Sequence, residues 1–178
     1  LSSLKQTQWA DHGTCRVVEV STTGKLLASG KVGGDLEGVT SDPASGLVYI
    51  VREGHEVIFE IDPGDLSIKR RFTIGRGFGG NEDFLKRGGD GIEGLTFVPV
   101  EGHKEGGRFF AVNQNAPPVL LELSLPIRSS TERFASARVI EAYKVGSAPL
   151  SGVTWDPLAG RLLIVSALWR VAYLADTE

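Results

Sequence analysis

One seven-residue phrase occurs three times in the chain and limits what the chain can fold into. The copies lie at residues 37–43, 93–99 and 151–157 and read EGVTSDP, EGLTFVP and SGVTWDP. Glycine, an aliphatic residue and threonine recur in the same order, and the copies start 56 and 58 residues apart. Short strand-forming segments repeated at a period of roughly 40–50 residues are typical of β-propellers, in which each repeat is one four-stranded antiparallel blade. We therefore expect an all-β fold of this kind.

Each copy of the phrase is followed by a similar series of strand-forming segments. Aliphatic and aromatic residues fill these segments, and Gly, Pro, Asp and Asn separate them, which favours strands over helices. The predicted strands after the phrase are 47–51, 57–62 and 69–74 in the first unit, 108–112, 119–123 and 138–143 in the second, and 161–165 and 171–174 in the third. The first two units are complete, and the third ends after its third strand.

A little over three blades are expected in one propeller domain. Residues 16–30 align with the third and fourth strands of a unit. The predicted parts are a partial blade at 1–34, a blade at 35–74 followed by a loop at 75–91, a blade at 92–147, and an incomplete blade at 148–178. Closed propellers typically have at least four blades. The chain also begins with Leu and contains no Met. We therefore expect a processed or partial chain, with the remaining blades elsewhere in the protein or in another chain.

Composition excludes several classes of function. The formal net charge is −3 and no block of Lys and Arg occurs, which argues against a nucleic-acid surface. No apolar run reaches the roughly 18–20 residues of a membrane span, so a soluble protein is expected. Cys15 is the single cysteine, which rules out an intrachain disulfide and a cysteine-based metal site. The compartment stays open, and a processed secreted or organelle-lumen protein fits this composition.

Acidic residues gather at the start of two copies of the phrase, where inner strands would begin beside the propeller axis. Glu37 and Glu93 precede the glycines, and Asp35 and Asp90 lie just upstream. Carboxylates that face one channel repel one another unless they are neutralised, and a hard cation with oxygen ligands, Ca²⁺ before Mg²⁺, would do this. The alternative is that the glutamates accept hydrogen bonds from backbone or arginine groups between blades. Ser151 replaces glutamate in the third copy, so a site would be asymmetric.

Evidence for catalysis in the sequence is weak. None of the three histidines is spaced as a zinc pair, and no G-x-S-x-G motif occurs. Glu53 and His55 are the weak candidates for a general base, because they follow a predicted strand on the same face as the acidic residues. Residues 75–80 fit G-x-G-x-x-G, but the segment that follows is too short for a βαβ unit, so no nucleotide is expected. The loop at 75–91 is long enough to act as a lid or a partner contact.

The sequences at 35–62 (DLEGVTSDPASGLVYIVREGHEVIFEID) and 90–96 (DGIEGLT) resemble the SdiA-regulated and phytase-like propeller families. The resemblance covers about 35–176. It implies a five- or six-bladed propeller, with Ca²⁺ bound in several members and phosphoesterase activity among the phytase-like members. The senescence-marker and gluconolactonase propellers are similar at a greater distance. They place a metal-ligand glutamate just before the glycine of such a phrase, which would match Glu37 and Glu93.

Two functions of different classes follow. The first is a non-catalytic propeller that binds a protein partner or a small polar ligand, as a subunit of a larger assembly and with structural Ca²⁺. It is favoured by the missing triad and the long loop. The second is a metal-dependent hydrolase of a phosphate ester or lactone, in which a cation in the central funnel polarises the substrate and activates water.

Overall fold

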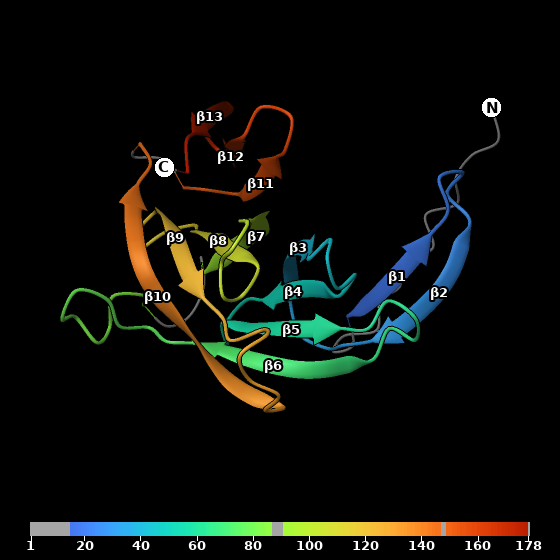
Figure 1. Ribbon diagram of the computed structural model, residues 1–178. Helices are drawn as coiled ribbons and strands as arrows, with labels where there is room; N and C mark the ends of the chain where they lie inside the picture. Colours follow the sequence, from blue (N-terminus) through green and yellow to red (C-terminus); the bar gives the residue numbers. More distant parts are fainter. Residues whose placement is uncertain (1–14, 87–90, 147–148, 178) are drawn as a thin grey trace, which may run out of the picture.

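The computed structural model describes residues 15–86, 91–146 and 149–177, which contain thirteen β-strands and no helix (Figure 1). The strands are β1 (Arg16–Val20), β2 (Leu26–Lys31), β3 (Leu36–Ser41), β4 (Val48–Arg52), β5 (Val57–Ile61), β6 (Ile68–Ile74), β7 (Ile92–Pro99), β8 (Gly107–Asn113), β9 (Val119–Ser124), β10 (Phe134–Lys144), β11 (Gly152–Asp156), β12 (Arg161–Ser166) and β13 (Val171–Ala175). The predicted all-β fold is thus confirmed. Within these ranges no helix is available to cross a membrane.

Each copy of the repeated phrase forms the first strand of an antiparallel meander. The meanders are β3–β4–β5–β6, β7–β8–β9–β10 and β11–β12–β13, and β1 and β2 form a separate hairpin. The first two meanders join into one eight-stranded sheet in the order β3-β4-β5-β6-β10-β9-β8-β7. The terminal strands of this order, β3 and β7, lie side by side, so the sheet is nearly closed (Figure 1).

The join between the two meanders depends on the length of β10. Its first part, Phe134–Ala137, pairs in parallel with Arg71–Ile74 of β6. Its second part, Arg138–Lys144, pairs antiparallel with β9. The sequence predicted only the second part, because Phe134 is followed by small residues that carry little strand signal.

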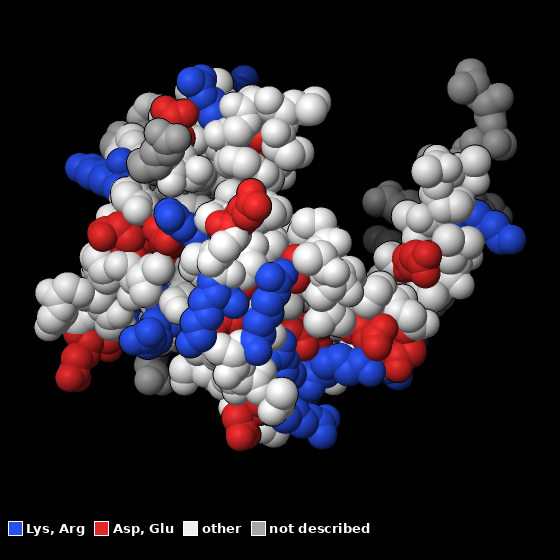
Figure 2. Space-filling model, in the orientation of Figure 1, with Lys and Arg blue, Asp and Glu red and all other residues white. Residues whose placement is uncertain are grey.

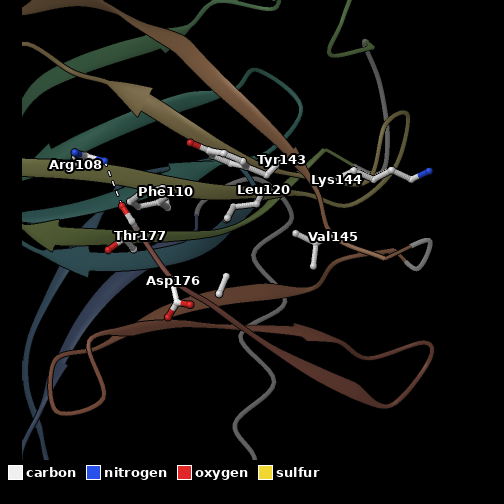
Figure 3. A pocket seen from close by; sticks show the side chains of 9 residues that line it. Arg108, Phe110, Leu120, Tyr143, Lys144, Val145, Asp176 and Thr177 are labelled. Carbon is white, nitrogen blue, oxygen red and sulfur yellow. Dashed lines mark hydrogen bonds between the residues drawn. The ribbon is translucent and has the colours of Figure 1, made fainter.

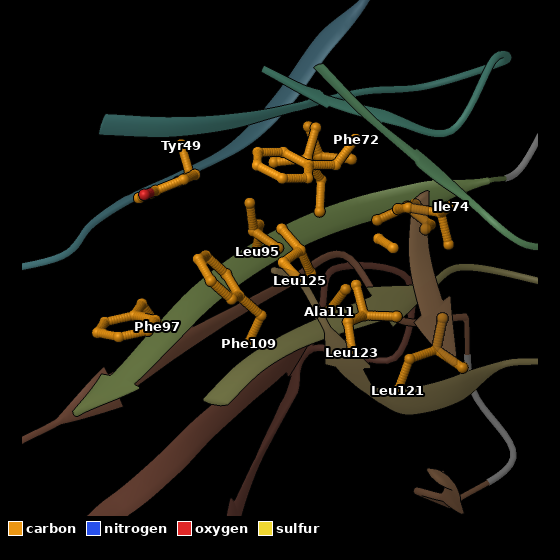
Figure 4. Packing of buried hydrophobic residues seen from close by; sticks show 14 of the residues in the cluster. Tyr49, Phe72, Ile74, Leu95, Phe97, Phe109, Ala111, Leu121, Leu123 and Leu125 are labelled. Carbon is orange, nitrogen blue, oxygen red and sulfur yellow. The ribbon is translucent and has the colours of Figure 1, made fainter. Parts of the chain in front are cut away.

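Buried side chains fill the spaces between neighbouring meanders. The largest cluster lies between β3–β6 and β7–β10, where the Phe109 ring packs 5.0 Å from Tyr49 and 4.9 Å from Phe97, centroid to centroid (Figure 4). A second cluster lies between β7–β10 and β11–β13, and a third lies between β3–β6 and the β1–β2 hairpin. Burial of each large apolar side chain contributes about 1.5–3 kcal/mol, so these layers hold the meanders together.

Charges on the outside of the eight-stranded sheet are mixed in sign. Figure 2 shows basic and acidic side chains interspersed on the face viewed there. Lys69 and Asp62 form an exposed ion pair of 3.1 Å at the start of β6. This face has no wide surface of a single charge.

The threonine of the phrase links the first strand of one meander to the first strand of the next. The Thr40 hydroxyl oxygen in β3 accepts a hydrogen bond of 3.0 Å from the backbone N–H of Phe97 in β7. The Thr96 hydroxyl in β7 accepts an equivalent bond of 3.0 Å from the N–H of Trp155 in β11. The same bond is made twice in register, which explains why threonine recurs in the sequence.

The glycine of the phrase allows these strands to approach closely. A β-carbon on Gly38 would lie 2.1 Å from the backbone nitrogen of Leu95, and one on Gly94 would lie 2.8 Å from that of Val153. Neither distance can be relieved by turning a side chain, because the clashing atoms belong to the neighbouring backbone. A β-carbon on Gly152, in contrast, would meet only a methyl group of Val165, at 3.3 Å.

Gly94→Ala should therefore destabilise the chain by roughly 1–3 kcal/mol, the usual range for forced overpacking. Gly152→Ala is the matched control and should leave the free energy of unfolding nearly unchanged or slightly raised, because alanine is the better strand residue. Urea-induced unfolding of both variants checks this. If both variants lose the same free energy of unfolding, close strand approach is not the reason for the repeated glycine.

Candidate functional site

Three carboxylates come together where β3 begins and β4 ends. Asp35 precedes β3, Glu37 lies within it, and Glu53 directly follows β4. The backbone N–H of Glu53 donates to the carbonyl of Asp35 at 2.9 Å, which holds the two segments together. The pairing of β3 with β4 shifts register between Leu36 and Val39, so Glu37 lies in a β-bulge. Bulges change the direction of side chains relative to a regular strand.

The spacing of these carboxylates fits a single bound cation. One oxygen from each of the three side chains lies within 4.8 Å of the others. Two oxygens bound to one Ca²⁺ can be at most twice the metal–oxygen distance apart, about 4.6–5.2 Å. The three side chains supply only oxygen ligands, which suits Ca²⁺ and Mg²⁺. We call Asp35, Glu37 and Glu53 the acidic group.

Burial and electrostatic repulsion both act on Glu37 within the acidic group. Burial raises the pKa of Glu37 above its ordinary value, and the charges of Asp35 and Glu53, together with a hydrogen bond to the Asp35 side chain, raise it further. Asp35 is exposed, and Glu37 and Glu53 are half-buried. A cation bound between them would favour the ionised form of Glu37.

Glu53 also connects the acidic group to the next meander. Its Oε1 atom accepts a hydrogen bond of 2.7 Å from the backbone N–H of Gly91, directly before β7. A β-carbon on Gly91 would lie 3.0 Å from Cγ of Glu53, so a larger residue would crowd this contact. Glu53 is therefore held in place from both sides, by Asp35 through its backbone and by Gly91 through its side chain.

The other candidates from the sequence lie outside this group. Glu93 is half-buried in β7 and is not one of the three grouped residues. His55 is exposed in the turn between β4 and β5 and is also not one of them. Asp90 falls outside the described residues. Of the proposed metal ligands, the structure thus brings together Asp35 and Glu37, and it adds Glu53, which the sequence indicated only as a weak candidate base.

Several further carboxylates are buried and bound by arginine. Glu60 accepts hydrogen bonds from Arg70 and from the Tyr49 hydroxyl (2.9 Å), and Glu56 pairs with Arg76. Arg70 also donates to backbone carbonyls of the β9–β10 connection, at 2.7 Å to Ile127 and to Ser130. These contacts secure the joined sheet and the start of the 75–86 loop, so the buried carboxylates have a structural role. Within the described residues, no arginine forms a hydrogen bond or an ion pair with the acidic group.

Comparison with known proteins adds no family assignment. No protein-family model matches the chain, and no curated protein sequence matches it significantly. The resemblance of residues 35–62 to the SdiA-regulated and phytase-like propellers stays an interpretation of those residues.

The pH dependence of stability should report on Glu37. Because its pKa is raised in the folded chain, ionised Glu37 lowers stability at neutral pH, and protonation removes this penalty as the pH falls through the raised pKa. Glu37→Gln should therefore be at least as stable as the wild type at pH 7 in EDTA, and its advantage should shrink toward the ordinary pKa of 4.5. Thermal unfolding between pH 4 and 8 measures this. A Glu37→Gln variant that is less stable than the wild type at pH 7, and gains stability relative to it at low pH, would contradict a raised pKa of Glu37.

Proposed function

We propose that the chain is part of a calcium-binding β-propeller, similar to the SdiA-regulated and phytase-like propellers, whose function is to bind a protein partner or a small polar ligand. The propeller arrangement is supported by the three meanders, whose first strands β3, β7 and β11 follow one another as neighbours. The observation that carries the cation is the acidic group beside those inner strands. In five- or six-bladed propellers this region lies near the central channel.

Calcium is the favoured cation because of the ligand set. Three carboxylates bring a charge of −3 to one point when they are ionised, and Ca²⁺ accepts 6–8 oxygen ligands in irregular geometry. Mg²⁺ requires nearly octahedral geometry and keeps several waters, so it is the second choice. Glu53 is already fixed by Gly91, which reduces the ordering that a bound ion would impose.

A hydrolase with the same cation is the alternative function, and nothing in the geometry favours it. A metal-dependent phosphoesterase or lactonase needs a general base beside the cation and the substrate. Glu53, one of the two candidate bases, is a member of the acidic group, and His55, the other, is exposed outside it. We therefore place binding ahead of catalysis.

Calcium should raise the thermal stability of the chain. At a concentration 100-fold above the dissociation constant, a cation bound only to the folded state adds about 2.7 kcal/mol, which corresponds to several degrees in Tm for a domain of this size. Glu37→Gln and Asp35→Asn should abolish the increase, and the exposed Glu132→Gln should retain it. Melting curves in EDTA and in Ca²⁺ test this, and an unchanged Tm of the wild type in Ca²⁺ would overturn the cation site.

The binding function has its own test. The wild type, loaded with Ca²⁺, should hydrolyse generic phosphate monoesters and lactones no faster than a Glu53→Gln variant does. Turnover by the wild type that the Glu53→Gln variant lacks, while the circular dichroism spectra of the two agree, would overturn the binding function in favour of the hydrolase.

A further inference from the structure

The four-residue turn between β4 and β5, residues 53–56, contacts the long connection between the first two meanders at two places. Glu53 accepts its hydrogen bond of 2.7 Å from the backbone N–H of Gly91, at the end of this connection. Glu56, which is buried, forms an ion pair with Arg76 near its start. One short turn thus anchors the connection at both ends.

Gly91 brings the two carboxylates of the turn close to each other. A β-carbon on Gly91 would lie 3.3 Å from Oε1 of Glu53 and 3.5 Å from Oε1 of Glu56. Both side chains therefore lie against the same buried glycine. Because protein interiors are close-packed, a displacement of the Glu53 side chain changes the packing around Gly91 and with it the surroundings of the Glu56 carboxylate.

Arg76 extends this anchor into the loop at 75–86. Its guanidinium donates hydrogen bonds to the backbone carbonyls of Leu85 (3.1 Å) and Lys86 (2.8 Å). Its own backbone carbonyl accepts one of 3.0 Å from the N–H of Leu85, a buried residue of the largest core cluster. The base of the loop is thus closed by one arginine, whose charge partner is Glu56.

The rest of the loop projects from the sheet. In Figure 1 it is the green segment after β6, which extends beyond the end of that strand. The backbones of Phe78 and Asn81 exchange two hydrogen bonds of 3.0 Å, which closes a tight hairpin. The ring of Phe78 packs 5.3 Å from that of Phe84, centroid to centroid. The tip is therefore an ordered hairpin whose orientation depends on how firmly its base is held.

We propose that the turn at 53–56 couples the acidic group to the 75–86 loop, so that a cation bound by Glu53 restrains the loop. A carboxylate has two oxygens, so Glu53 can bind the cation through one and keep its hydrogen bond to Gly91 through the other. Fixing Glu53 fixes Gly91 and then the base of the loop. Because coupling between two sites is reciprocal, a partner that orders the loop raises the affinity for the cation. The effector rests on the cation site proposed above, whereas the contacts that carry the coupling belong to the chain itself.

Hydrogen exchange of the Leu85 amide tests these contacts without any cation, because this amide lies at the base of the loop. In EDTA, Glu53→Ala should raise its exchange rate roughly three- to tenfold, the effect of losing one hydrogen bond. His55→Ala is the matched control and should leave the rate unchanged, because His55 lies in the same turn but is exposed and outside the acidic group. Equal rates in Glu53→Ala and the wild type would overturn the coupling.

The amide of Leu120 is the reference for unfolding of the whole chain. Leu120 lies in β9, which is paired along both edges, and it lines a cavity of about 260 Å³ beside β10 (Figure 3). No residue of the turn at 53–56 lines that cavity. In the wild type, Leu85 should exchange faster than Leu120 relative to their intrinsic rates, because the base of the loop opens without unfolding the sheet. Equal protection of the two amides would mean that the loop opens only with the whole chain, which would overturn its separate control.

Calcium then separates the coupling from the cation site. In saturating Ca²⁺, the Leu120 amide of the wild type should exchange more slowly, because an ion bound to the folded chain stabilises it as a whole. Leu85 should slow as well, because opening the base of the loop disturbs the Glu53 side chain that holds the ion. A slower Leu120 with an unchanged Leu85 would leave the cation site intact and overturn the coupling.

A calcium response of neither amide has a different meaning. It would overturn the cation site, and calcium control of the loop would fall with it. The contacts between Glu53, Gly91 and the loop would then be judged by the Glu53→Ala variant in EDTA alone.

Discussion

The close approach of β3, β7 and β11, the first strands of the three meanders, is the constraint on which the rest of the structure depends. Gly38 and Gly94 let β3, β7 and β11 come nearer than any side chain would allow, and threonine hydroxyls then bond to the next backbone. A hydrogen bond of this kind, from a backbone N–H to a side-chain hydroxyl, contributes only about 0.5–1.5 kcal/mol. Its larger effect is on register, because it fixes which side chains of neighbouring meanders meet in the core clusters.

The same approach explains why acidic side chains crowd at one point. The bulge in β3 places Glu37 directly beside Gly38, the glycine that contacts β7. The backbone N–H of Gly91, directly before β7, donates a hydrogen bond to Glu53. Glu53 is held there by its hydrogen bond to Gly91, whereas Asp35 is exposed. Burial first and then the repulsion within the group raise the pKa of Glu37, and protonation or a bound cation would relieve the repulsion.

The sequence predicted the strands well and the contacts between meanders poorly. The repeated phrase and the alternating apolar segments indicated most strand positions, because these signals are local. The parallel pairing of β6 with β10 depends on the backbone of Phe134–Ala137, where the side chains carry no strong signal. Asp35 and Glu37 were predicted from their place beside the phrase. Glu53 joins them only because β3 pairs with β4. Composition does not reveal the register of that pairing, so the sequence could not predict that Glu53 lies in the group.

The first and fourth strands join the meanders in different ways. The first strands use glycine and threonine, so each contact depends on particular residues. The fourth strands β6 and β10 use a parallel backbone pairing, which accepts many sequences because the hydrogen-bonding groups belong to the main chain.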